Sequence, residues 1–171
     1  MEHQKLLENT FIVLTADHGE TLGDYNLGDF GHGESLRPEL IQIPLLLMGP
    51  GITPGRTSCI GQSSDLANTL LQMAELPPMS GDGQDLRTQC RSFARHFLYQ
   101  TDKFSFLAVH SETTELSWDC QKRLLESYDL TTSPPLWVQN PPSPDPELLQ
   151  NLQNLISDVN ATMPESSCPM P

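Results

Sequence analysis

Basic residues are scarce in this sequence. Nine lysines and arginines stand against 22 aspartates and glutamates in 171 residues, which gives a formal net charge of −13 at pH 7. Nucleic-acid binding needs clustered Lys and Arg to neutralise phosphates, so the composition excludes nucleic acid as an expected partner. Apolar residues make up only 37% of the chain, and prolines number 15. This balance predicts one modest core with much irregular structure.

Long hydrophobic runs and a targeting segment are also missing. No run of 18 apolar residues occurs, so we expect no transmembrane helix. The N-terminus lacks the apolar stretch of a signal peptide, which leaves the cytoplasm as the default compartment. The four cysteines have no metal-ligand spacing, and they could pair only if the protein is exported.

One segment does carry a chemical signal. The apolar run at residues 11–14 leads directly into Asp17, His18 and Gly19, and His32 follows between two glycines. Carboxylate and imidazole are ligands for divalent cations, and the ends of buried strands are where open α/β sheets hold their ligands. The alternative is an ordinary turn in which Asp17 caps and His18 packs. The glycine, the second histidine and the strand that follows favour a metal or a phosphate/sulfate site.

Residues 15–20, with the sequence Thr-Ala-Asp-His-Gly-Glu, resemble the second metal-binding motif of the sulfatases in the alkaline phosphatase superfamily. Other segments resemble parts of that family in the same order. They are the loop at 30–36, the strand and Pro-Gly exit at 43–51, the helix at 64–74, the loop at 83–86 and the segment at 128–134. The resemblance covers residues 5–86 well and residues 120–158 loosely.

The resemblance implies an α/β fold. We expect a partial alkaline-phosphatase-like mixed sheet flanked by helices, followed by a small C-terminal antiparallel sheet and a terminal helix. Residues 1–86 would be the C-terminal part of the catalytic domain and would carry the metal motif. Residues 87–159 would be a small α+β subdomain, and residues 160–171 a disordered tail. Half of the central sheet would be missing, which leaves an edge for a partner chain that completes it.

The resemblance also implies roles for the polar residues. Asp17 and His18 would hold a divalent metal ion, which is calcium in sulfatases and zinc or manganese in the phosphoryl-transfer relatives. His32 would be the catalytic residue that faces the substrate, either as a further ligand or as a hydrogen-bond donor to the ester. Glu20 and Glu34 would orient the imidazoles or remain solvated.

No nucleophile is assigned. Sulfatases convert the Cys or Ser of a C/S-x-P-x-R signature to formylglycine, and this signature does not occur here. Three hypotheses follow. The first is an incomplete sulfatase-like hydrolase of sulfate esters, and the second is a phosphoethanolamine transferase or phosphodiesterase-type relative. The third is a non-catalytic truncated product. The substrate would be a sulfate or phosphate ester of a small molecule or glycan.

Hydrophobic patterning predicts the local structure. We expect buried strands at residues 11–16 and 43–48, and a helix that begins at Ser64 or Asp65. Further elements are expected in the second half: strands at 95–100 and 104–110, a strand or helical turn at 122–128, an extended connector at 134–146 and a helix at 146–159. The other histidines, His3, His96 and His110, have no partner spacing, and we interpret them as surface or core residues.

Overall fold

The computed structural model describes residues 6–23, 28, 30–100 and 103–171, and it divides the chain into two compact units. The first unit comprises residues 1–32 and 37–57; the second comprises residues 33–36 and 58–171. Five residues of the expected catalytic portion, 1–5, lie outside the described residues, as do 24–27 and 29 in the loop after Asp17. The domain boundary predicted at residue 86 stays a prediction.

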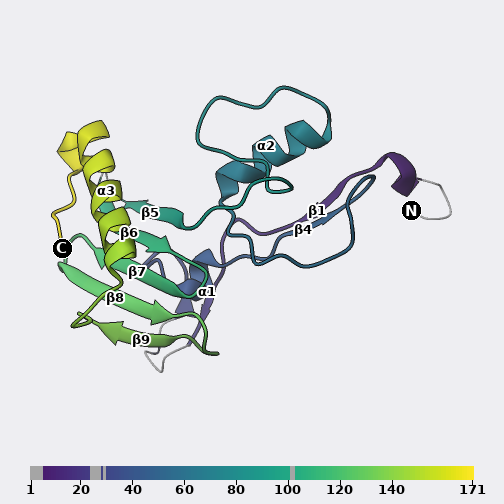
Figure 1. Ribbon diagram of the computed structural model, residues 1–171. Helices are drawn as coiled ribbons and strands as arrows, with labels where there is room; N and C mark the ends of the chain where they lie inside the picture. The colour runs from purple at the N-terminus through teal and green to yellow at the C-terminus, as the bar shows by residue number, and fades with distance from the viewer. Residues whose placement is uncertain (1–5, 24–27, 29, 101–102) are drawn as a thin grey trace. The chain divides into compact units, whose positions relative to one another are not determined.

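The first unit contains short elements joined by long turns. They are the 3-10 helix η2 (Leu6–Asn9), the strands β1 (Ile12–Leu14), β2 (Thr21–Leu22), β3 (Phe30–Gly31) and β4 (Leu46–Met48), and the helix α1 (Pro38–Ile41). The strands form two antiparallel ladders, β1 with β4 and β2 with β3. Figure 1 shows β1 and β4 running side by side.

The expectation that β1 and β4 are buried strands is wrong for the described structure. β1 pairs antiparallel with β4, with Val13 opposite Leu47, and forms no described parallel ladder. Leu14 is 56% exposed and Leu46 is 47% exposed. A continuous apolar run predicts a strand that is covered on both faces, but a two-stranded ribbon cannot cover its own faces. The apolar side chains of this ribbon therefore remain at the surface.

The second unit is built on a five-stranded antiparallel sheet in which each strand pairs with its neighbours in the sequence. The strands are β5 (Ala94–Gln100), β6 (Lys103–His110), β7 (Thr114–Asp119), β8 (Leu124–Asp129) and β9 (Leu136–Gln139). The predicted small antiparallel sheet is confirmed. β7 was not predicted, and β9 lies where we expected an extended connector.

The terminal helix α3 (Pro146–Thr162) covers one face of this sheet (Figure 1). Asp145 caps it, because the Asp145 carboxylate accepts a hydrogen bond from the Leu148 amide at 2.9 Å. Leu152 and Ile156 on its inner side are fully buried in the core with strand residues. The predicted helix is confirmed, and it continues three residues beyond the predicted end.

The segment expected to be a disordered tail is structured. The 3-10 helix η4 (Pro164–Ser166) follows α3, and Cys168 forms a disulfide with Cys120 at the end of β7. Cys168 is buried, and the Trp118 indole donates a hydrogen bond to the Pro169 carbonyl oxygen at 2.8 Å. The polar, proline-containing composition of this segment suggested disorder. The disulfide between Cys120 and Cys168 instead ties the segment to the end of β7. Among the described residues, no helix combines the length and apolar character needed to cross a membrane.

Helix α2 (Ser63–Met73) is held by a buried carboxylate. Its N-cap is Gln62, and not the predicted Ser64 or Asp65, because Asp65 serves as the acidic partner of the capping box. The fully buried Asp65 also accepts a hydrogen bond from Arg91 Nε at 2.9 Å. Burial alone would raise the pKa of Asp65, but the Arg91 guanidinium and backbone amides outweigh burial and lower that pKa below its ordinary value.

Replacement of Asp65 should therefore destabilise the second unit strongly. Removal of one partner of a buried ion pair costs about 3–5 kcal/mol, so Asp65→Asn should lower the free energy of unfolding by that amount. The matched control is Asp85→Asn, since Asp85 pairs with the more exposed Arg87 at 2.7 Å. That pair lies near the surface and should be worth about 1 kcal/mol or less. Urea unfolding followed by tryptophan fluorescence would measure the free energy of unfolding of the two variants. Equal losses of this free energy would contradict the prediction that the buried Asp65 stabilises the fold more than Asp85 does.

The lowered pKa also fixes the direction of the pH dependence. A carboxylate with a depressed folded-state pKa stabilises the fold above its ordinary titration range, and that stability is lost as pH falls through the folded-state value. The wild-type chain should therefore lose stability in acid below the usual Asp range, and Asp65→Asn should remove this part of the acid sensitivity.

Candidate functional site

The turn that carries Asp17 and His18 follows strand β1 and is fixed by Gly19. The Gly19 amide donates a hydrogen bond to the Leu40 carbonyl oxygen at 2.8 Å. A Cβ atom at position 19 would lie 1.9 Å from the Glu39 carbonyl oxygen. No other residue fits at position 19 without moving the backbone, so the close backbone approach explains why the motif has glycine there.

The β2–β3 ladder brings Glu20 and His32 together although twelve positions separate them. Thr21 pairs with Gly31, so the residues just outside this pair face each other at the end of the ladder. The Thr21 hydroxyl strengthens the pairing by donating to the Gly31 carbonyl oxygen at 2.6 Å. The result is a contact of 3.1 Å between His32 Nδ1 and Glu20 Oε2.

His18 lies between Asp17 and His32. Its ring centroid is 4.2 Å from that of His32, and its Nε2 is 3.6 Å from Asp17 Oδ2. His18 Nδ1 is 2.8 Å from the Gly19 carbonyl oxygen. A carbonyl oxygen only accepts, so Nδ1 carries a proton, and in the neutral form of the ring Nε2 holds the lone pair. This is the tautomer that a metal-binding imidazole needs.

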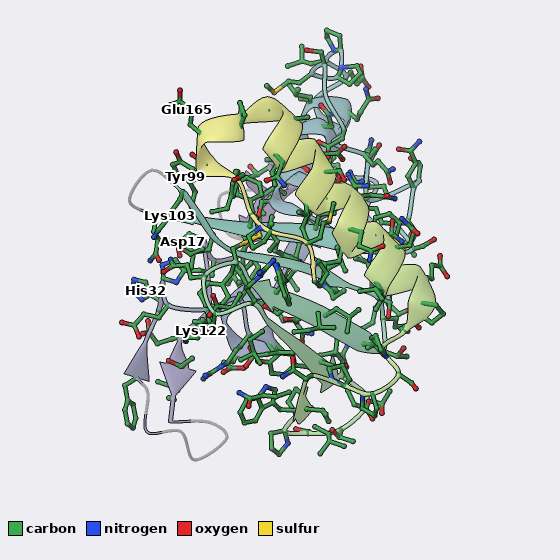
Figure 2. The ribbon with its side chains drawn as sticks, turned by 90° about the vertical axis from the view of Figure 1, so that its left-hand side faces the viewer. Asp17, His32, Tyr99, Lys103, Lys122 and Glu165 are labelled. Atoms are coloured by element: carbon green, nitrogen blue, oxygen red, sulfur yellow. A yellow bond between two sulfur atoms is a disulfide. The ribbon has the colours of Figure 1, made fainter. Side chains whose placement is uncertain are left out.

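Asp17 is held as a carboxylate. Its Oδ1 accepts a hydrogen bond from the His18 amide at 3.0 Å. The backbone amides of His18 and of Asp17 itself, followed by the charge of the His18 ring, lower the pKa of Asp17 below its ordinary value. The side chain is 87% exposed, and both Asp17 and His32 lie at the surface of the molecule (Figure 2). Asp17 is therefore an anion that a cation can approach from solvent.

The structure groups the candidate ligands differently from the expected pairing. Among the described residues, His18, Glu20 and His32 each offer one ligand atom, and these three atoms lie within 4.8 Å of one another. Asp17 contacts His18 but is not a member of this group. Glu20 was expected only to orient an imidazole. Glu34 is exposed and belongs to the second unit.

Two of the remaining histidines, His96 and His110, contact each other in the second unit, which agrees with the core alternative of the prediction. His96 on β5 and His110 on β6 stack against each other, with His96 Nε2 2.9 Å from His110 Nδ1. Burial, with a smaller contribution from His110, lowers the pKa of His96 to about 3. Burial also lowers the pKa of His110. Both rings are therefore neutral at physiological pH, and their contact joins strands β5 and β6 of the second unit. His3 lies outside the described residues.

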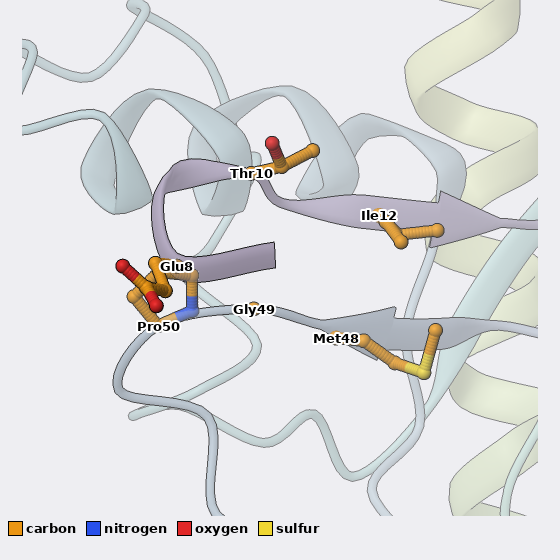
Figure 3. Close-up of a pocket in the computed structure, with 6 residues that line it drawn as sticks. All are labelled: Glu8, Thr10, Ile12, Met48, Gly49 and Pro50. Carbon is orange, nitrogen blue, oxygen red and sulfur yellow. The ribbon is translucent and has the colours of Figure 1, made fainter. Parts of the chain in front are cut away.

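A hollow of about 350 Å³ lies beside the start of β1 and the end of β4 (Figure 3). Residues that line it include Glu8, Thr10, Ile12 and Met48. Asp17 follows the other end of β1, so this hollow does not contain the histidines of the motif. Its lining brings together one carboxylate and one hydroxyl, which is too little to identify a chemistry.

The comparisons with known proteins agree with the motif. The sulfatase family model matches residues 1–76, which include the whole of the Asp17 turn and His32. The match covers 76 of the 171 residues and identifies this part of the chain as a sulfatase-family segment, within the alkaline phosphatase superfamily. This family assignment confirms the sequence resemblance, and the match ends within the turn that follows helix α2.

Two curated relatives of the chain are named as a sulfotransferase and a sulfatase. The low-salt glycan biosynthesis sulfotransferase Agl7 of Haloferax volcanii is 39% identical over 89 residues, which is 50% of this chain and 22% of the relative. The extracellular sulfatase SULF-1 homolog of Drosophila melanogaster is 40% identical over 85 residues, 47% of this chain and 7% of the relative. The chain thus spans less than a quarter of the length of either protein.

Solved structures support the fold. A protein solved in complex with its substrate D-glucosamine-2-N,6-O-disulfate has a TM-score of 0.66 and 18% identity, over 98% of this chain and 37% of that one. A structure assigned to the sulfatases from Bacteroides thetaiotaomicron has a TM-score of 0.67 and 19% identity, over 92% of this chain and 37% of that one. The α/β fold of this chain, with its C-terminal sheet and helix, is thereby confirmed.

The steric role of Gly19 generates a prediction. Gly19→Ala should displace the turn and cost about 1–3 kcal/mol or more, because the clash is with backbone and a side-chain rotation cannot relieve it. Gly55→Ala is the matched control, since a Cβ at position 55 meets nothing within 4 Å. Hydrogen exchange of the residue 19 amide would report the bond to Leu40. Protection should be lost in Gly19→Ala and retained in Gly55→Ala; retained protection in both would show that the turn tolerates a side chain.

Proposed function

We propose that this chain supplies the cation-binding and ester-binding part of a sulfatase that hydrolyses sulfate esters. Asp17 and His18 hold a divalent cation, and His32 faces the ester as the catalytic residue. The observation that carries the proposal is the convergence of Asp17, His18 and His32 within the segment that matches the sulfatase family. Glu20 orients His32, with which it makes its 3.1 Å contact.

The surroundings of Asp17 and His18 suit these roles. Asp17 is a carboxylate because neighbouring amides lower its pKa, and the neutral His18 ring would present Nε2 because Nδ1 donates to the Gly19 carbonyl. Glu20 contacts Nδ1 of His32. The other ring nitrogen, Nε2, would be the atom that donates a hydrogen bond to the ester or accepts one. A bound cation supplies the positive charge that neutralises a sulfate oxygen and lowers the pKa of a nucleophile.

The donor set fits a divalent cation and fits calcium only in part. Calcium takes about six to eight oxygen ligands, whereas the Asp17 carboxylate offers two oxygens and His18 offers a nitrogen. Calcium binding by these two residues is therefore expected to be weak, with water or further oxygen ligands completing the shell. Calcium remains our proposal for the metal on the ground of the family, and zinc or manganese is the alternative.

The proposed substrate class is a sulfated glycan or a smaller sulfate ester. One relative is named for glycan biosynthesis, and one structural neighbour was solved with a sulfated glucosamine. Both names involve sulfate and a sugar, which favours a sulfate ester over a phosphate ester. A phosphoethanolamine transferase or phosphodiesterase activity is the alternative that the assay below separates.

A non-catalytic role is the second candidate, and a specific observation favours it. The structure pairs Cys59 with Cys90 and Cys120 with Cys168 and leaves no free cysteine. None of them stands in a C/S-x-P-x-R signature. The chain therefore offers no thiol that could become formylglycine, and its role by itself would be to bind a cation and an anionic ester.

Two measurements on the 171-residue chain test the proposal. Amide chemical shifts of residues 17–19 should move on calcium addition, and Asp17→Asn should abolish the shift because it removes the anionic ligand. Glu112→Gln, an exposed acid of the second unit, is the control that should leave the shift intact. Shifts that persist in Asp17→Asn would remove Asp17 from the cation site.

Turnover assays then assign the chemistry. Hydrolysis of an aryl sulfate in preference to an aryl phosphate supports the sulfatase, and the reverse preference supports the phosphoryl-transfer relative. Cation and sulfate binding without any turnover supports the non-catalytic role. His32→Ala should weaken sulfate binding in every case, and unchanged sulfate binding would exclude His32 from the ester site.

We also infer that the chain folds in an oxidising compartment, in place of the cytoplasm expected by default. Two disulfides in one chain of this size are typical of exported proteins, and one relative is named as extracellular. Thiol titration of the denatured, unreduced protein purified from its native source should find no reactive cysteine. Four reactive thiols would contradict the inference.

A further inference from the structure

The group His18, Glu20 and His32 has a composition that differs from the pair assigned to calcium. It offers two imidazole nitrogens and one carboxylate oxygen, all within 4.8 Å of one another. Imidazole suits zinc and neighbouring first-row metals, whereas calcium prefers oxygen. We propose that these three side chains form a zinc-type cation site, and that a metal bound there excludes calcium from Asp17 and His18 because His18 belongs to both.

The geometry requires little movement. Ligand atoms of a tetrahedral zinc ion, each about 2.1 Å from the metal, lie about 3.4 Å apart. His32 Nδ1 and Glu20 Oε2 are already 3.1 Å apart. No separation in the group exceeds 4.8 Å, so none must shorten by more than about 1.4 Å, the difference between 4.8 and 3.4 Å. All three side chains are exposed, so rotation about their side-chain bonds accomplishes this without repacking a core.

Backbone interactions position all three ligands. The β2–β3 ladder places Glu20 opposite His32, and the Gly19 carbonyl fixes the His18 ring with its Nε2 available. A hydrogen bond from the second ring nitrogen to a carbonyl is how metal-binding histidines are commonly oriented. Three protein ligands leave a fourth position open at the surface, which is an arrangement that zinc tolerates.

Asp17 separates the two sites. Its carboxylate is engaged by the His18 amide at 3.0 Å, and it lies outside the three-residue group. Zinc binding should therefore survive the loss of Asp17, while calcium binding should not. Zinc would also take His32 away from the ester, so a metal in this site acts as an inhibitor of the proposed reaction. That consequence rests on the function proposed above; the zinc site itself does not.

Isothermal titration of the disulfide-intact chain with zinc chloride tests the site. Wild type should bind one zinc ion, and Glu20→Gln and His32→Ala should each weaken binding by at least about tenfold, since even groups that only orient a ligand cost about 10–100-fold. Asp17→Asn should bind zinc with unchanged affinity, as should the control Glu112→Gln.

Two further measurements test whether Glu20 is itself a metal ligand and whether the variants remain folded. Glu20→His replaces the carboxylate with another zinc ligand and should restore zinc binding to within about tenfold of wild type. Far-UV circular dichroism of each variant should match wild type, as the substituted side chains are exposed. Saturation with calcium should lower the apparent zinc affinity of wild type and leave that of Asp17→Asn unchanged.

Specific results overturn the proposal. Absence of saturable zinc binding, or binding that survives both Glu20→Gln and His32→Ala, removes the site. Zinc binding that Asp17→Asn abolishes would place zinc in the Asp17–His18 pair instead. Failure of the proposed function is seen separately, as calcium-induced shifts that do not depend on Asp17 or as sulfate binding that does not depend on His32.

Discussion

The hydrogen bond from the Gly19 amide to the Leu40 carbonyl oxygen is the constraint on which the site depends. It joins the turn after β1 to the one-turn helix α1, in which Leu40 is buried. The bond requires the backbone at position 19 to approach the Glu39 carbonyl more closely than any side chain allows. Once that approach is made, Asp17 and His18 have fixed backbone positions. The local bonds from the His18 amide and to the Gly19 carbonyl then set their charge and tautomer.

The exposure of the site limits what it can do in this chain. Asp17 is 87% exposed, and charges in contact with water interact weakly and are screened by salt. The strands that lead to the site also expose apolar side chains, among them Leu14, Leu46 and Met48. A protein layer over that ribbon would bury apolar surface, and if it reached the Asp17 turn it would strengthen cation binding by excluding water. A single protein layer could thus both bury the apolar side chains of the ribbon and strengthen cation binding.

The sequence predicted the turn at Asp17 and His18, which depends on local chemistry, and the cation-binding role of these residues stays a prediction. Asp17, His18 and Gly19 are adjacent, and their types alone indicate a turn and a cation. The contact of His32 with Glu20 depends on the register of two strands of two residues each, which are too short to show any alternation of polar and apolar side chains. For that reason Glu20 could be assigned only an orienting role. The His96–His110 contact arises across the β5–β6 ladder, and the positions of the two strands along the chain do not give the register that brings these residues together.

In the fold, too, local signals predicted individual elements, whereas contacts between distant segments were not predictable. Helix α3 has a capping aspartate and an apolar stripe at helical spacing, both of which are local signals, and it lies where expected. The partner of β1 was not predictable, because an apolar run identifies a strand without identifying its neighbour. The disulfide between Cys120 and Cys168 spans 48 residues, and four cysteines permit three pairings. The order of the last residues follows from that bond, and their composition alone suggested the opposite.

The choice of cation follows from how these side chains are shared. His18 contacts both Asp17 and His32, so it is common to an oxygen-rich arrangement and to a nitrogen-rich one. An imidazole nitrogen has one lone pair, so His18 Nε2 cannot serve two ions at once. If His32 coordinates a metal through Nδ1, its contact with Glu20 becomes part of that metal's ligand shell and ceases to orient the ring toward an ester. If His32 binds the ester as proposed, the spacing of the three exposed side chains would thus make ester binding and coordination of a zinc-type metal mutually exclusive.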